Sequence, residues 1–298
     1  MSGERFHKEV AMRIVIVGAG NVGTALAVLL KQAGHTIIGI ASRTEESATK
    51  AGTLLGAPYA TDPLQFTRQA DIVFLTTPDR AIADVCAQIA AKDGFSQGTI
   101  VAHTSGAHSS QILNSAIGAR TISFHPLQTF ANPDSGIINL PGSFITIEGQ
   151  TTALSTARQL ISDLSCRPLE IPTEGKPLYH AAACIACNYF TTLLDTALQV
   201  MEAAGVNKED GLPALAPLIE GTWNTILRAG TTQALTGPIA RGDTTTVETH
   251  LQEMNEKIPS VIPLYRLLGQ ATVDVATAKG TLGETELRQL LKTLGGAK

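Results

Sequence analysis

The chain has 298 residues, a formal net charge of −4 and only 16% charged residues. No basic stripe stands out, which argues against a nucleic-acid partner. No uncharged apolar run reaches the roughly 18 residues of a membrane span, so no membrane partner is expected. The four cysteines lack the spacing of a disulfide framework, which favours a reducing, cytoplasmic location. A length near 300 residues suggests about two domains.

Residues 12–23 contain the pattern around which the first half is organised. A β-branched run leads into G-x-G-x-x-G, and an apolar helical pattern follows at once. In dinucleotide-binding folds the first glycine makes the turn, the second admits the pyrophosphate and the third lets the helix pack closely. The uncapped N–H groups of the helix also favour phosphate. The candidate cofactor-binding residues here are Gly18, Gly20, Asn21, Val22 and Gly23.

Strand and helix patterns alternate up to about residue 172. Further strands are expected at 36–41, 57–60, 71–76, 99–102, 121–124, 144–147 and 168–171. This alternation predicts an α/β fold, a Rossmann-type, doubly wound, mostly parallel sheet. Strand patterns then stop, and helices are expected at 176–204, 213–228, 245–256, 263–278 and 284–294. We therefore expect a disordered extension over 1–11, a Rossmann dinucleotide-binding domain over 12–172 and an all-α domain over 173–298.

The end of the second strand indicates which dinucleotide is bound. In NAD-specific folds an acidic residue at this point holds the ribose 2′-hydroxyl. Here Ser42, Arg43 and Thr44 follow the strand instead, and an arginine can pair with a 2′-phosphate. The alternative is that Thr44 caps the next helix and Arg43 is solvated. We favour NADP, although Glu45 and Glu46 would repel a phosphate if they faced it.

Three segments follow successive strands at the edge where ligands of open α/β sheets bind. The first contains Thr76, Thr77 and Pro78, and the second contains Ser105. These four residues are predicted to contact the nicotinamide end of the cofactor. The third segment contains His125, which is predicted to contact the substrate.

The helix that begins near Lys176 contains polar side chains at intervals of four residues. Lys176, His180, Cys184 and Asn188 form one slowly winding stripe. A lysine, a histidine and an amide on one face can supply proton transfer and orientation to a carbonyl or imine. Lys176, His180 and Asn188 are therefore candidate catalytic residues. The alternative is that His180 is a core or interface residue and Asn188 a packing hydrogen bond.

The same helix contains the pattern H-x-x-x-C-x-x-C, formed by His180, Cys184 and Cys187. Zinc-binding cysteine pairs usually lie on turns that let both thiolates converge. This pair lies within an apolar helix with no second pair. We therefore expect small buried thiols and no metal.

A glycine-punctuated loop lies between two predicted helices, at residues 235–244. Its Arg241 could bind a substrate carboxylate or a cofactor phosphate. Arg241 and Thr236 are therefore candidate substrate-binding residues. The alternative is an internal Arg241–Asp243 pair in which Asp243 caps the next helix.

Several of these motifs together resemble a known family. They are residues 18–23, 77–79, 103–106, 123–128, 179–182 with 188–189, and 235–238 with 241–243. The family joins a Rossmann-like domain to a helical domain of unknown function and is related to deazaflavin-dependent NADP oxidoreductases, pyrroline-5-carboxylate reductases and ketopantoate reductases. The resemblance covers nearly all of the chain and implies an NADP-binding domain, a helical dimerisation domain and a cleft between them. Wider relatives among hydroxyacid dehydrogenases carry a lysine and, four residues on, an asparagine, whereas here His180 follows Lys176.

The resulting hypothesis is an NADP(H)-dependent oxidoreductase that acts on a small oxo or imino acid as a homodimer. One alternative is hydride exchange with a deazaflavin or another cofactor. The other is a non-catalytic NADP-binding protein that senses redox state or acts as a scaffold.

Overall fold

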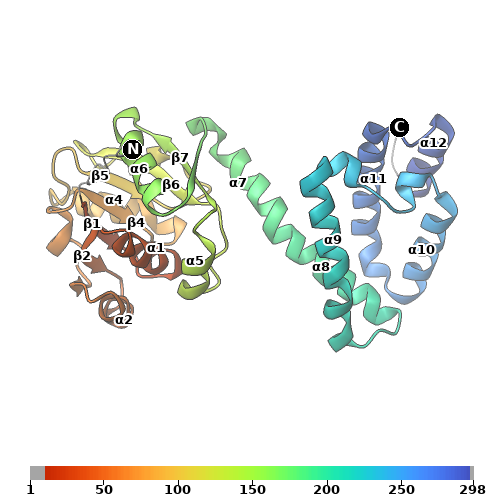
Figure 1. Ribbon diagram of the computed structural model, residues 1–298, viewed down its shortest axis with the longest axis horizontal. Helices are drawn as coiled ribbons and strands as arrows, with labels where there is room; N and C mark the ends of the chain where they lie inside the picture. The colour runs from red at the N-terminus through yellow and green to blue at the C-terminus, as the bar shows by residue number, and fades with distance from the viewer. Residues whose placement is uncertain (1–10, 296–298) are drawn as a thin grey trace, which may run out of the picture. The chain divides into compact units, whose positions relative to one another are not determined.

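The computed structural model describes residues 11–295 and divides into two compact units. The first unit ends at Ile185 and the second begins at Ala186 (Figure 1). This division falls later than the expected boundary at residue 172, because helix α7 (Lys176–Cys184) is anchored on the first unit by its buried Lys176 side chain. The expected extension over 1–11 lies outside the described residues, apart from Ala11.

The first unit is built on an eight-stranded sheet of order β3-β2-β1-β4-β5-β6-β7-β8. Its strands are β1 (Arg13–Val17), β2 (Thr36–Ala41), β3 (Tyr59–Ala60), β4 (Ile72–Leu75), β5 (Ile100–His103), β6 (Arg120–Pro126), β7 (Phe144–Gly149) and β8 (Arg167–Glu170). Every neighbouring pair is parallel except β6 and β7. The predicted Rossmann-type, mostly parallel sheet is confirmed.

Helices cover both faces of this sheet, which explains why its central strands are apolar throughout (Figure 1). On β1, Ile14 and Ile16 face one core, whereas Val15 and Val17 face the other. The helices are α1 (Asn21–Gln32), α2 (Glu45–Leu55), α3 (Leu64–Thr67), α4 (Ile82–Ala90), α5 (Pro133–Asn139) and α6 (Thr151–Asp163). Helix α5 was not predicted, and it begins with a capping box between Asn132 and Ser135.

The helix predicted over 176–204 is interrupted. A π-helical turn, Ile185–Tyr189, separates α7 from α8 (Phe190–Ala203), and the two units divide at its start. By length and composition the helical stretch Thr173–Ala203 could cross a membrane, with a mean hydropathy of 1.2. A single helix of this kind also occurs in proteins that never enter a membrane. The expected absence of a membrane partner therefore stays a prediction.

The second unit is all helical, as predicted. Its helices are α8, α9 (Lys208–Ala234), α10 (Thr244–Lys257), α11 (Ile262–Lys279) and α12 (Glu284–Thr293). Helix α9 is longer than the predicted 213–228 and contains a break at Gly230, where φ is 78°. The core of this unit consists of Ile239, Val247, Val273, Ala276, Leu290 and Leu294.

Candidate functional site

The three glycines after β1 are present for different reasons. Gly18 has a φ of +115°, and a Cβ there would lie 2.6 Å from the carbonyl carbon of Thr76. A Cβ on Gly23 would lie 2.1 Å from the Gly18 oxygen. A Cβ on Gly20, in contrast, would meet no atom within 4 Å. The fold therefore requires the first and third glycines, whereas the second faces open space that a ligand can fill.

That open space belongs to a cavity of about 1100 Å³ at the carboxyl ends of β1, β2 and β4. This volume slightly exceeds the usual range for drug-sized ligands, roughly 300–1,000 Å³, and suits a dinucleotide. Helix α1 starts at the cavity, and its N-cap Gly20 makes no side-chain capping bond, so the N–H groups of the first turn are available to phosphate. The predicted residues that line the cavity are Gly18, Gly20, Asn21, Val22, Ser42, Arg43, Thr44, Thr76, Thr77 and Pro78.

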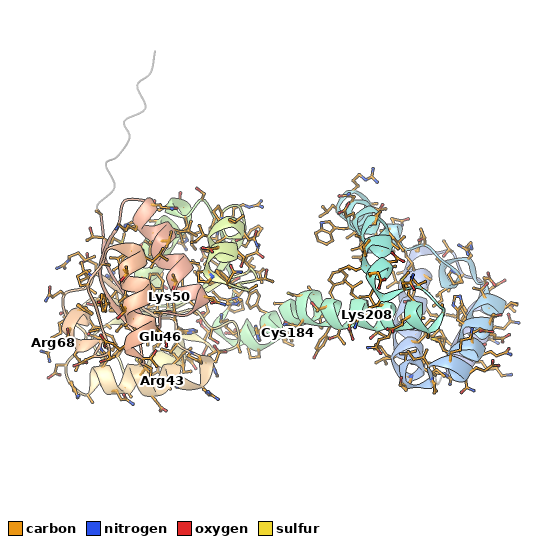
Figure 2. All side chains as sticks on the ribbon, turned by 90° about the horizontal axis from the view of Figure 1, so that it is seen from below. Arg43, Glu46, Lys50, Arg68, Cys184 and Lys208 are labelled. Atoms are coloured by element: carbon orange, nitrogen blue, oxygen red, sulfur yellow. The ribbon has the colours of Figure 1, made fainter. Side chains whose placement is uncertain are left out.

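Arg43 is the predicted cation of this cavity. Its side chain is exposed at the start of α2, and it makes no ion pair or hydrogen bond with another described residue (Figure 2). Thr44 caps α2 by accepting a hydrogen bond from the Ser47 N–H at 3.3 Å. Glu45 and Glu46 are absent from the cavity wall. The cap and an available Arg43 therefore coexist, and the two glutamates do not oppose a phosphate there.

Other predicted cofactor residues hold the protein's own backbone. The Asn21 amide donates to the carbonyls of Phe130 and Ala131, at 2.9 and 3.0 Å. The Thr76 hydroxyl donates to the Gly18 carbonyl at 2.6 Å. These two side chains fix the shape of the cavity, and their backbones form its wall.

Ser105 and Gly23 do not line the cavity. Ser105 is buried, and its hydroxyl donates to the Asp79 carboxylate at 2.8 Å. Asp79 itself lies on the cavity wall. Ser105 therefore lies behind Asp79 and not on the cavity wall, where the sequence pattern had placed it. The sequence shows where a strand ends, but not which side chain covers that end.

Lys176 is fully buried, and its Nζ donates to the Ser105 carbonyl at 3.0 Å. Burial lowers the pKa of Lys176 to about 8, while Glu148 and Asp79 act in the opposite direction. The ammonium therefore binds the loop that follows β5, behind the cavity wall. A lysine whose pKa lies near 8 can release a proton close to neutral pH.

Glu148 is a buried carboxylate that the sequence analysis missed. It accepts hydrogen bonds from the Ser110 N–H and hydroxyl at 2.6 and 2.9 Å, and from the Thr173 hydroxyl at 2.8 Å. These bonds satisfy the charge and tie the segment before α7 to β7. A single acidic residue within an apolar strand was the signal that could have identified it.

His125 is linked to Tyr179 of α7. Its Nδ1 lies 2.8 Å from the Tyr179 hydroxyl, which also accepts a hydrogen bond from the Thr146 hydroxyl at 2.8 Å. The antiparallel register of β6 and β7 places His125 directly opposite Thr146. Burial lowers the pKa of His125 to about 3, and the neighbouring Lys176 contributes to this shift. The imidazole is therefore neutral at physiological pH.

Two further histidines lie in the same region. His180 Nδ1 is buried without a partner among the described residues, and its Nε2 lies 3.6 Å from the Cys184 sulfur. His103 accepts a hydrogen bond from the Ser105 N–H at 3.1 Å, and burial lowers its pKa to about 4. The first unit thus brings three histidines and Lys176 together beside the carboxyl ends of β5 and β6.

The remaining predicted site residues belong to the second unit. Asn188 lies in the π-helical turn and is exposed, as are Thr236 and Arg241. Asp243 caps α10 by accepting a hydrogen bond from the Thr246 N–H at 3.0 Å. The capping interpretation is correct, but no Arg241–Asp243 ion pair occurs among the described residues.

Within residues 11–295, no group of three histidine, cysteine or acidic side chains could hold a metal ion. The expectation of small buried thiols was wrong for Cys187, which is exposed, while Cys184 is half-buried.

Comparisons with known proteins agree with this architecture. Residues 4–126 match the Rossmann-like domain family, and residues 143–272 match the domain of unknown function DUF2520. The chain therefore joins a Rossmann-like domain to a DUF2520 domain, and the resemblance drawn from its motifs is confirmed. None of the curated proteins matches the sequence.

Three solved structures illustrate the likeness. A Bacteroides fragilis protein, whose name proposes an NADP oxidoreductase, is 26% identical over 89% of this chain and 98% of its own, with a TM-score of 0.72. A reductive aminase from Aspergillus terreus, in complex with NADPH and ethyl levulinate, is 18% identical over 94% and 99%, with a TM-score of 0.65. A pyrroline-5-carboxylate reductase from Coxiella burnetii is 14% identical over 97% and 100%, with a TM-score of 0.60. The last two share the fold, and the reductive aminase binds the cofactor that the sequence predicts here.

Proposed function

We propose that this protein is an NADP(H)-dependent oxidoreductase that transfers a hydride to or from a small oxo or imino acid. The open space in front of Gly20 carries the proposal. No described atom lies close enough to require a glycine at this position, whereas a bound pyrophosphate needs the backbone to be bare there. Solved relatives named as NADP oxidoreductases or crystallised with NADPH support the same function.

The cavity residues suit the parts of NADP. The N–H groups at the start of α1 would hold the pyrophosphate. The unpaired Arg43 guanidinium would bind the 2′-phosphate, and the Ser42 hydroxyl would add a hydrogen bond. Thr77 and Pro78 would flank the nicotinamide, and the buried Thr77 hydroxyl has no partner among the described residues. NADPH supplies the hydride when bound.

Proton transfer is assigned to α7. Lys176 has a pKa near 8 and His180 has an unpaired buried nitrogen, so either side chain could exchange the proton that accompanies the hydride. The substrate-binding roles of Asn188, Thr236 and Arg241 stay predictions that rest on the sequence motifs.

A homodimer through the helical unit is part of the proposal. Large apolar side chains are exposed on this unit, and surfaces of this kind usually mark an interaction site. The most exposed are Tyr189, Trp223, Leu218, Leu227 and Leu267. A cytoplasmic location, as the unpaired cysteines suggest, would suit an NADPH-consuming enzyme.

The decisive experiment compares NADPH binding with folding in Gly20→Ala. We expect NADPH affinity, measured by fluorescence titration, to fall at least about 100-fold because the Cβ occupies the path of the pyrophosphate. The free energy of unfolding should change by no more than about 1 kcal/mol, the usual effect of an N-cap substitution. Unchanged NADPH affinity in a folded Gly20→Ala protein would refute the cofactor site.

The choice between NADP and NAD is tested at Arg43. Arg43→Ala should weaken NADPH binding by about 10- to 100-fold and leave NADH binding nearly unchanged, since a charge-assisted bond contributes about 1.5–3 kcal/mol. Lys50→Ala is the matched control, because Lys50 is an exposed cation of α2, seven residues after Arg43, and does not line the cavity (Figure 2). Equal losses for NADPH and NADH would exclude a 2′-phosphate contact.

Catalysis itself is tested with a panel of oxo acids, cyclic imines and a deazaflavin, followed by NADPH absorbance. Turnover of an oxo or imino acid supports the proposal, and turnover of the deazaflavin alone supports hydride exchange between cofactors. Tight NADPH binding with no turnover would favour a non-catalytic NADP-binding protein.

A further inference from the structure

Two hydrogen bonds around His125 favour one of its two tautomers. The Thr146 hydroxyl donates to the Tyr179 oxygen, and the phenolic proton is then available to His125 Nδ1. With Nδ1 as the acceptor, the proton of the neutral imidazole lies on Nε2. The strand register supports this chain of bonds, because His125 and Thr146 face each other across β6 and β7.

The surroundings keep this imidazole neutral. His125 is half-buried, Tyr179 is hydrogen-bonded to it, and the other titratable groups that act on it are Lys176, His180 and His103. Each of these can only be positive or neutral, so none stabilises an imidazolium. In a neutral imidazole that is protonated on Nε2, this nitrogen can only donate a hydrogen bond.

His125 Nε2 lies against Gly106, in the loop after β5. A Cβ on Gly106 would lie 2.8 Å from His125 Nε2 and 2.5 Å from the unpaired His180 Nδ1. The two ring nitrogens therefore lie close to the same point of the backbone, where an added Cβ would force at least one of the rings to move. Thr104 of the same loop lines the cofactor cavity. The N–H donor thus lies at the carboxyl ends of β5 and β6, where substrates of open α/β sheets bind.

We propose that His125 is a catalytic residue that donates its Nε2–H to a carbonyl oxygen of the substrate, and that Tyr179 is the positioning residue that holds this tautomer. This inference rests on the proposed function and names its substrate class as an oxo acid. When the hydride from NADPH adds to the carbonyl carbon, the C=O electron pair moves to the oxygen, and the His125 N–H stabilises that charge. One proton from Lys176 or His180 then gives the hydroxyl, so the products are a hydroxy acid and NADP⁺.

The donor explains why an oxo acid is favoured over a protonated imine. A carbonyl oxygen has lone pairs that accept the Nε2–H, whereas an iminium nitrogen has none. Negative charge develops on a carbonyl oxygen during reduction, and a fixed N–H donor stabilises that charge most in a site from which water is excluded.

The first test measures the tautomer directly, without turnover. Proton–nitrogen NMR of the full chain, labelled at histidine with ¹⁵N, should show His125 as the neutral Nε2–H form from pH 8 to pH 5. Tyr179→Phe removes the bond to Nδ1, so the variant should show a mixture of tautomers. His250 is an internal reference, because its Nδ1 also lies 2.8 Å from a tyrosine hydroxyl, that of Tyr265, but at an exposed position. An Nδ1–H tautomer at His125 overturns the proposal.

The second test asks whether the donor meets a substrate carbonyl. Oxamate and a series of 2-oxo acids of increasing size are added to the NADP⁺-saturated protein, and at least one should shift the His125 Nε2–H signal downfield. With an oxo acid that is turned over, His125→Phe should lower kcat at least about 100-fold without changing NADPH affinity, whereas His250→Phe should not. No shift with any member of the series, or an unchanged kcat in His125→Phe, overturns the proposal.

The proposed function and the role of His125 can be refuted separately. A wild-type protein that does not bind NADPH refutes the proposed function, whatever the tautomer of His125. A protein that binds NADPH but reduces only cyclic imines retains the oxidoreductase function and refutes His125 as a carbonyl donor.

Discussion

The two units differ most in how completely they bury their own apolar side chains. In the first unit the strand β1 is buried on both faces, between two cores. In the second unit the buried core is small, while Trp223 and Leu227 of α9 are 58% and 65% exposed. A parallel sheet needs helices on both faces and obtains them from its own chain. A small set of amphipathic helices leaves one apolar face uncovered. Such a face usually marks an interaction site.

The same contrast applies to one pair of side chains that occurs in both units. His125 with Tyr179 and His250 with Tyr265 have the same bond length, 2.8 Å, and similar edge-to-face rings. His125 and Tyr179 are half-buried and lie beside Lys176, whereas His250 is exposed. The pair alone therefore does not define a functional site, because the surroundings of the two side chains differ.

The largest expected difference is in the free energy of unfolding, between alanine variants at one glycine of each unit. Gly23→Ala places a Cβ 2.1 Å from the Gly18 oxygen, so backbone must move, and we expect a loss of more than about 3 kcal/mol in the free energy of unfolding. Gly221→Ala in α9 meets no atom within 4 Å and should be neutral or stabilising by up to about 1 kcal/mol. Urea denaturation of both variants measures the difference, and similar losses would contradict the contrast in packing.

The next largest effect is the pH dependence of stability that Lys176 causes. The ordinary pKa of 10.5 falls to about 8 in the folded protein. Between these values the unfolded chain binds more protons, so this group makes stability rise with pH from 8 to 10.5, by up to about 3 kcal/mol. The cost of the buried charge is fully present below pH 8.

Lys176→Met retains the apolar stem and removes the charge, so it should abolish this rise. The measurement is the difference in unfolding free energy between the wild type and the variant across pH 7–10.5, in urea. Lys208→Met, at an exposed lysine of the second unit, is the control (Figure 2). Parallel curves for the wild type and Lys176→Met would show that burial does not perturb this lysine.

The smallest effect on stability should come from the exposed apolar face of α9. Trp223→Ser and Leu227→Ser should change the unfolding free energy of the isolated chain by about 0.5 kcal/mol or less, because surface substitutions rarely do more. Light scattering should nevertheless show that these variants shift a dimer toward the monomer. Leu54→Ser is the control, since Leu54 of α2 is 61% exposed but belongs to the first unit. A wild type that is monomeric, or a dimer unaffected by both substitutions, would refute the proposed interface.

The sequence alone was sufficient for the features that depend on local order along the chain. The glycine pattern after β1, the alternation of strands and helices and the all-helical second half follow from turn chemistry and hydrophobic periodicity. The same local reasoning pointed to Arg43, which lines the cavity, and to the Asp243 cap. It also placed Lys176, His125 and His180 among the candidates, because strand ends and helix faces can be counted from the sequence.

Only the tertiary structure decided how those candidates are partnered. It placed Ser105 behind Asp79, buried Lys176 against the Ser105 carbonyl and paired His125 with Tyr179. These contacts join residues more than 25 positions apart, so no local pattern contains them. The burial and the hydrogen bonds of such groups set their protonation, and both depend on which elements pack together. The chemistry of this site therefore comes from the packing of β5, β6, β7 and α7, whereas its location comes from the sequence.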